Sequence, residues 1–213
     1  MSLRVVVWDA TDAPRRVRLD HDGSNGTSRV RLGLSPAWWV GAKLHALARS
    51  LSGVAYRSAG VRSWEEAILF AVRCAREAPI AELQVWGHGG WGFMDLGDTR
   101  LDRPRLASLD PLAEVLAQDA QVWLRCCSAF GGRAGRAFAP ALAERLRRRV
   151  VGHTYVIGAL QSGTHSLAPG ARPSWPLEEG VVMVDGEPRS AKDSGVREPR
   201  TLGCLRLDLP AGF

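Results

Sequence analysis

Lysine is almost missing from this sequence of 213 residues. Only Lys43 and Lys192 are lysines among 28 basic residues, and the arginines are scattered along the chain. The formal net charge of +6 and the pI of about 9.8 suggest a nucleic-acid-binding protein, but this scatter weakens that interpretation. The one dense arginine cluster, at residues 145–149, falls at the predicted end of a helix, where cations favour the helix dipole. We therefore do not expect a nucleic-acid partner.

Cysteine and long apolar runs are also scarce. Four cysteines are too few for a disulfide-rich secreted domain. No apolar run approaches the ~18 residues of a membrane span, and the run at residues 5–8 is too short for a signal peptide. A chain of this length builds a core without disulfides or a structural metal. We expect a single domain over residues 1–213, located in the cytoplasm, with no membrane partner.

Short apolar runs alternate with longer helical patterns, which is typical of a parallel sheet with crossover helices. The predicted strands cover residues 3–8, 54–57, 83–86, 121–125, 150–157, 181–184 and 202–209. The predicted helices cover residues 36–51, 105–117 and 134–148, and a further helix follows a cap at Ser63 and includes Cys74. A small hairpin is predicted from residues 17–19 and 29–32, with its turn at residues 22–26. The fold class is therefore α/β, with a mainly parallel sheet flanked by helices.

Two further patterns locate helix features. Ser63 followed by Glu66 is typical of a capping box at the start of the second helix. The apolar spacing in the first helix predicts a buried stripe, made of Trp39, Leu44, Leu47 and Leu51. Cys74 lies on an apolar helix side, and His153 lies inside an apolar strand, so both are expected in the core.

Chemically capable residues follow two predicted strands. Ligands of open parallel sheets bind beyond the carboxyl ends of the strands, and one strand is followed by His88, the next by Cys126 and Cys127. A histidine beside a cysteine can act as the base for a thiolate nucleophile. Gly89 can offer its N–H to a developing oxyanion. The helix after Gly131 is expected to lower the pKa of the cysteine through its positive end.

These stretches resemble a known family. Residues 83–90 form an apolar strand ending in His-Gly, and residues 122–131 form a strand, a cysteine and a glycine-containing turn. Together they resemble the caspase-like cysteine peptidases, a superfamily that includes caspases, separases, gingipains, metacaspases and bacterial CHAT-type proteases. The histidine precedes Cys127 by 39 residues, close to the ~50 of caspases. The resemblance covers about residues 65–160, and more weakly the first strand.

The resemblance implies a caspase-like three-layer sandwich and a set of site residues. It implies Cys127 as the nucleophile, His88 as the proton carrier, and the N–H groups of Gly89 and Cys127 as the oxyanion hole. Cys126 is then a small buried neighbour. We expect the segment after residue 157 to form the substrate pocket. The residues expected to contact the substrate are Gln161, Ser162 and Trp175. Ser128 stands where caspases have arginine, so strict aspartate specificity is not expected.

The predicted function is that of a cysteine endopeptidase with a His88–Cys127 dyad and an acyl-enzyme intermediate. It needs no cofactor and acts on a protein or peptide substrate, with a regulatory protein as a further partner. Three alternatives stay open: a non-peptidase cysteine hydrolase, a catalytically inactive domain of this fold that binds a partner, and an arginine-rich nucleic-acid binder. A metal site is not expected, because adjacent cysteines on a strand point to opposite faces and no Cys-x-x-Cys spacing exists.

Overall fold

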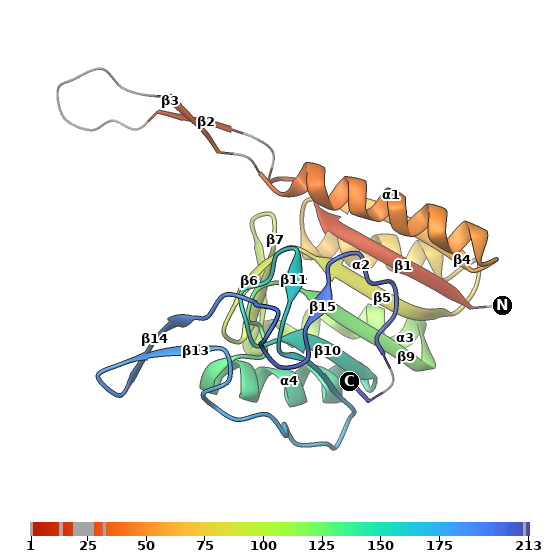
Figure 1. The fold of residues 1–213 in the computed structure, drawn as a ribbon. Coiled ribbons are helices and arrows are strands. Elements are labelled where there is room, and N and C mark those ends of the chain that lie inside the picture. The colour runs from red at the N-terminus through yellow and green to blue at the C-terminus, as the bar shows by residue number, and fades with distance from the viewer. Residues whose placement is uncertain (1, 13–14, 19–27, 32, 211) are drawn as a thin grey trace.

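The computed structural model describes residues 2–12, 15–18, 28–31, 33–210 and 212–213 (Figure 1). Its helices are α1 (Ser35–Leu51), α2 (Trp64–Cys74), the 3₁₀ helix η1 (Arg103–Leu109), α3 (Asp110–Val115) and α4 (Gly132–Leu146). Its strands are β1 (Leu3–Asp9), β2 (Arg15–Arg18), β3 (Ser28–Arg31), β4 (Ala55–Val61), β5 (Ile80–Trp86), β6 (His88–Gly90), β7 (Phe93–Leu96), β8 (Thr99–Asp102), β9 (Leu116–Arg125), β10 (Arg149–His153), β11 (Leu160–Gln161), β12 (Thr164–Leu167), β13 (Val181–Val184), β14 (Glu187–Ala191) and β15 (Leu202–Gly203).

A six-stranded sheet forms the centre of the molecule, in the order β12–β10–β9–β5–β1–β4. Neighbouring strands run parallel except at one edge, where β12 pairs antiparallel with β10. The predicted mixed α/β class with a mainly parallel sheet is therefore confirmed. Because parallel strands end at the same edge of a sheet, the carboxyl ends of β1, β5 and β9 lie side by side.

Both faces of this sheet are covered, and the core is divided between them. In β1, Val5 belongs to the core cluster that also contains residues of α2, α3 and α4, whereas its neighbour Val6 belongs to the cluster that contains Ala42 of α1. The α1 face is completed by the residues after β15, where Leu209 and Phe213 pack against Trp123 of β9. Burial on both faces explains the continuous apolar run at residues 5–8 in β1.

The predicted buried stripe of α1 is wrong. All four of its members are exposed: Trp39, Leu44, Leu47 and Leu51. The helix instead buries the opposite side, where Gly41 and Ala42 allow a close approach to the sheet and His45 and Arg49 reach a polar layer beneath. A Cβ atom on Gly41 would lie 2.9 Å from the ring of Trp86. Polar partners on the sheet therefore decide which side of α1 faces inward.

The helix α1 spans 17 residues and keeps charged residues along its length. Within the described ranges, no helix combines the length and the apolar character needed to cross a membrane.

The predicted strand at residues 202–209 is mostly wrong. Only Leu202 and Gly203 pair as a strand, with β11. The next residues cross the α1 face of the sheet as an irregular segment, which we call the C-terminal segment (residues 204–208). Its carbonyl groups accept hydrogen bonds from arginine and glutamine side chains of the sheet and of α1 rather than from another strand. Hydrogen bonds from polar side chains therefore take the place of the backbone hydrogen bonds that a strand would have made in this segment.

Proline explains the differing form of the predicted helix 105–117. Pro104 lies in the first turn of the 3₁₀ helix η1 and Pro111 in the first turn of α3, so the segment is split, and β9 already starts at Leu116. The predicted strand 150–157 ends at His153. The predicted hairpin is present as the antiparallel pair β2 and β3, and its predicted turn at residues 22–26 lies outside the described residues.

The predicted N-terminal cap of α2 is confirmed. The Ser63 hydroxyl oxygen accepts from the Glu66 N–H at 3.2 Å. The Glu66 carboxylate does not complete the reciprocal half of a capping box, because it accepts from the N–H of Arg62.

The arginine cluster at the end of α4 binds neighbouring helices. Arg145 and Arg147 form ion pairs with Asp110 and Glu114 of α3. The guanidinium of Arg148 donates to the carbonyl groups of Leu116 and Ala117, the first two residues of β9. These contacts attach α4 to α3 and provide a structural use for the densest basic stretch of the chain.

Candidate active site

The strand register places His88 and Cys127 at matching positions. In the parallel pair of β5 and β9, Trp86 is the register partner of Arg125. His88 lies two residues beyond Trp86, and Cys127 lies two residues beyond Arg125. Because parallel neighbouring strands lie about 4.8 Å apart, residues at equal offsets past the paired ends stay close in space.

His88 and Cys127 line the same cavity, whose volume is about 350 Å³. One wall comes from the first turns of α1, including Trp38. The opposite side comes from the loop and short strand that contain Gln161, and from Leu205 of the C-terminal segment. The two predicted catalytic residues therefore line one cavity that is large enough for a ligand group.

An aspartate that was not predicted holds the imidazole of His88. The Nε2 atom of His88 lies 2.9 Å from Oδ2 of Asp12, in the loop after β1. The ring also packs edge-on against Trp38, with 5.3 Å between the ring centroids. A carboxylate only accepts hydrogen bonds, so the neutral ring carries its proton on Nε2 and its lone pair on Nδ1. The sequence places Asp12 after the first predicted strand, but only the strand order, in which β1 neighbours β5, brings it to His88.

Burial controls the ionisation of the Cys127 thiol. The side chain is half-buried, and its Sγ atom lies 3.9 Å from the carbonyl oxygen of Ile157. Burial raises the pKa of the thiol above its ordinary value, and the negative charge of Asp193 adds to that effect. The predicted lowering of this pKa by the following helix is therefore wrong in direction. In the described part of the chain, Cys127 and His88 are not hydrogen-bonded to each other.

The backbone turns sharply after Cys127. Ser128 adopts a left-handed conformation with φ of 45°, and its N–H donates to the carbonyl of Tyr155 at 2.8 Å. The carbonyl of Ser128 then accepts from Gly131, and α4 begins one residue later. The N–H of Cys127 itself makes no hydrogen bond to any described residue. A backbone N–H without a protein acceptor is a requirement for the predicted role of this group in an oxyanion hole.

Cys126 lies on the opposite side from Cys127, in the core. Its side chain is fully buried, and burial raises the pKa of its thiol well above the ordinary value. A Cβ atom on Gly89 would lie 2.7 Å from the Cys126 sulfur, so glycine is needed at that position for packing. Across the described ranges, no three histidine, cysteine or acidic side chains gather to hold a metal.

The three predicted substrate contacts lie in different places. Gln161 lines the cavity. Ser162 is buried beside it, with its hydroxyl bonded to Gly195 and Thr201. Trp175 is buried elsewhere and stacks on Phe130, to whose carbonyl its indole N–H donates at 3.0 Å. Of the three, only Gln161 can touch a ligand in this cavity.

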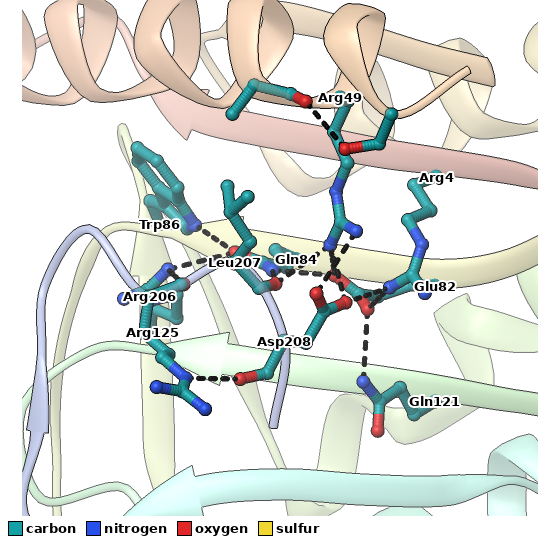
Figure 2. Close-up of polar contacts among 12 residues, drawn as sticks. Arg4, Arg49, Glu82, Gln84, Trp86, Gln121, Arg125, Arg206, Leu207 and Asp208 are labelled. Atoms are coloured by element: carbon teal, nitrogen blue, oxygen red, sulfur yellow. Dashed lines mark hydrogen bonds and ion pairs between the residues drawn. The ribbon is translucent and has the colours of Figure 1, made fainter. Parts of the chain in front are cut away.

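A buried arginine completes the cavity, and the sequence did not single it out. Arg125 is 3% exposed and contacts the ring faces of Trp86 and Trp123. Its guanidinium donates to the side chains of Gln84 and Gln161 and to two carbonyl groups of the C-terminal segment. Figure 2 shows this layer between the sheet, α1 and the C-terminal segment.

Glu82 is the buried anion of the same layer. Arg4 and Arg49 form ion pairs with it, and the amide groups of Gln84 and Gln121 donate to its carboxylate (Figure 2). Asp208 of the C-terminal segment provides a second carboxylate to both arginines. The layer therefore ties the C-terminal segment to β1, β5 and α1 beside the cavity.

The site combines a thiol and an imidazole held by a carboxylate, and both the cysteine and the histidine line one cavity. A scan against protein-family models and a search of curated proteins found no match for the chain.

Proposed function

We propose that the chain is a cysteine endopeptidase with a caspase-like fold. The observation that carries the proposal is the placement of His88 and Cys127 at equal offsets past the paired ends of β5 and β9, on one cavity. The mainly parallel sheet and the order of histidine before cysteine agree with the resemblance in residues 65–160. The enzyme would act on proteins or peptides in the cytoplasm without a cofactor.

The first step is activation of the thiol. Because burial raises the pKa of Cys127, the group starts as a neutral thiol at neutral pH. His88 then serves as the base, and its Nδ1 atom takes the thiol proton. Asp12 accepts the Nε2–H bond, fixes the tautomer and stabilises the imidazolium that forms.

The second step is acyl transfer. The sulfur of Cys127 attacks the carbonyl carbon of the scissile peptide bond, and the oxyanion accepts the N–H of Cys127 and that of Gly89. The imidazolium of His88 returns its proton to the leaving amine as the C–N bond breaks, which leaves a thioester. Water then attacks the thioester, with His88 as base, and releases the carboxylic acid and the free thiol.

A catalytically inactive domain that binds a protein partner is the second candidate. The raised pKa of the Cys127 thiol and the missing hydrogen bond to His88, among the described residues, favour it. Catalytic hydrogen bonds are often long without substrate, so these two observations do not decide against catalysis.

A peptidyl electrophile with mass mapping tests the proposal. We expect modification at Cys127, a strong loss of that modification in His88→Ala, and cleavage of internal bonds in a peptide mixture. Cys74→Ser is the matched control, because Cys74 is buried in the core away from the cavity. Labelling at Cys74 or Cys204 alone contradicts the dyad. Labelling at Cys127 with turnover of esters but not of peptides indicates a non-peptidase hydrolase.

A further inference from the structure

The cavity beside Cys127 has mostly apolar walls. Trp38 and Leu34 face it from the start of α1, Trp86 from the end of β5, Ile157 from the loop after β10 and Leu205 from the C-terminal segment. Glycine and alanine make up much of the rest of the lining. Its volume of about 350 Å³ lies at the small end of the range for ligand pockets, which suits one large side chain.

Arg125 is the one arginine or lysine in the described lining of the cavity. Each of its N–H donors already makes a hydrogen bond within the protein. Nε–H and one Nη2–H donate to the side-chain amide oxygen Oε1 of Gln161, at 3.1 and 2.8 Å. The other Nη2–H bonds the carbonyl of Cys204, and Nη1 bonds Gln84 and the carbonyl of Arg206, both at 3.1 Å. A guanidinium has five N–H donors, so none is left for a ligand.

This saturation argues against a charged ligand in the cavity. A carboxylate that entered would lose its water and find no free N–H of Arg125 to accept, which makes its burial unfavourable. A cationic side chain would meet the positive charge of Arg125. An apolar side chain instead gains from burial, and the rings of Trp38 and Trp86 offer edge-to-face contacts to an aromatic group.

We propose that this cavity is the specificity pocket and takes a large apolar side chain, such as phenylalanine, leucine or methionine, from the substrate residue that carries the scissile carbonyl. This inference rests on the proposed function, because Cys127 lines the cavity and attacks that carbonyl. A side chain seated in the cavity therefore belongs to the same residue as the carbonyl. The amide of Gln161 is oriented by Arg125, so its nitrogen is left to donate to the substrate backbone.

Two measurements test the pocket. The first compares kcat/KM for peptide amides with a fluorescent leaving group, in which the residue before the cleaved bond is Phe, Leu, Ala, Asp or Arg. The second measures Kd for acetylated peptide amides of the same sequences with the Cys127→Ala protein, by calorimetry. In both we expect the Phe and Leu peptides to exceed the Asp and Arg peptides by tenfold or more.

A variant of the pocket wall adds a direct check. Ala37 is exposed on α1 and lines the cavity, so Ala37→Phe fills the cavity without disturbing the core. We expect at least tenfold weaker binding of the Phe peptide and less than a twofold change for the Ala peptide. Ala107→Phe, at an exposed site in η1 outside the cavity lining, is the matched control and should change neither.

The outcomes separate the two proposals. Equal or better binding of the Asp or Arg peptides, or no effect of Ala37→Phe, overturns the apolar pocket. Apolar preference in binding without turnover of any peptide overturns the peptidase function and leaves the pocket assignment standing.

Discussion

His88 Nε2 lies 2.9 Å from Asp12 Oδ2, which joins the loop after β1 to the first residue of β6. We predict that Asp12→Asn lowers kcat by roughly tenfold to hundredfold, part of the 10²–10⁴ that general acid–base catalysis typically contributes. The reason is that an amide can donate to Nε2 and shift the ring proton to Nδ1, where the lone pair is needed. The measurement is kcat against pH for the wild type, Asp12→Asn and Asp12→Glu.

A structural role alone would lower stability and leave the pH profile of the remaining activity unchanged. A changed pH profile with partial rescue by Asp12→Glu supports positioning of His88. Asp119→Asn, at an exposed site on β9, is the matched control and should behave as wild type.

The adjacent cysteines should react very differently with iodoacetamide. In the native protein we expect modification of Cys127 and none of Cys126, which is fully buried. Because the pKa of the Cys127 thiol is raised, its rate in His88→Ala should keep increasing as the pH passes 9, the ordinary value for a thiol. Peptide mapping by mass spectrometry gives both results. Protein unfolded in urea is the control, and a rate that levels off below pH 7 would contradict the raised pKa.

Acid should destabilise the fold through two buried histidines. Burial lowers the pKa of His153 to about 3 and that of His45 to about 4, against 6.5 when unfolded. The unfolded chain therefore takes up protons first, and stability is lost as the pH falls from about 6.5 towards those values. At pH 5 each histidine costs about 2 kcal/mol of unfolding free energy.

Urea unfolding at pH 7.5 and pH 5 measures this loss. Burial keeps His153 neutral, its Nε2 accepts from the indole N–H of Trp123 at 3.2 Å, and the Thr164 hydroxyl oxygen lies 3.2 Å from its Nδ1. His153→Asn should lower stability at pH 7.5 but reduce the difference between the two pH values by about 2 kcal/mol. An unchanged difference would show that His153 is not the titrating group.

Removal of the buried anion should be costly. Glu82→Ala leaves Arg4 and Arg49 without their shared buried partner, and we expect a loss of about 3–5 kcal/mol of unfolding free energy. The matched control is Glu77→Ala, which breaks an ion pair with Arg57 in which both side chains are about half exposed. That change should cost less than about 1 kcal/mol. Equal losses in the two variants would refute the importance of burial here.

Local patterns predicted the strands that end at the site, because the last residues of β5 and of β9 are mostly apolar and a change of pattern follows each of them. The same reasoning placed Cys74 and His153 in the core, and both are buried. Equal offsets past paired strand ends then brought His88 and Cys127 to one cavity. What remained outside local reasoning was the strand order, which decides that the loop with Asp12 meets His88.

Two errors have a common physical cause. The apolar spacing of α1 identified an apolar face of the helix, but it carried no information on the residues against which the helix packs. Arg49, on the other face, forms ion pairs with Glu82 and Asp208. Trp175 looked like a groove residue because of its glycine- and proline-rich surroundings, yet it packs on Phe130 in the core. Partners distant in sequence decide both cases.

The position of the C-terminal segment also sets the order in which the site is completed. Arg49 and its ion-pair partner Asp208 are separated by 159 residues. Arg125 donates to the carbonyl groups of Cys204 and Arg206, which lie 79 and 81 residues further along the chain. During synthesis, a chain that has emerged only to residue 200 already carries His88 and Cys127 but lacks one wall of the cavity. The thiol thus exists before its pocket does, and selective chemistry becomes available only after the last part of that wall has left the ribosome.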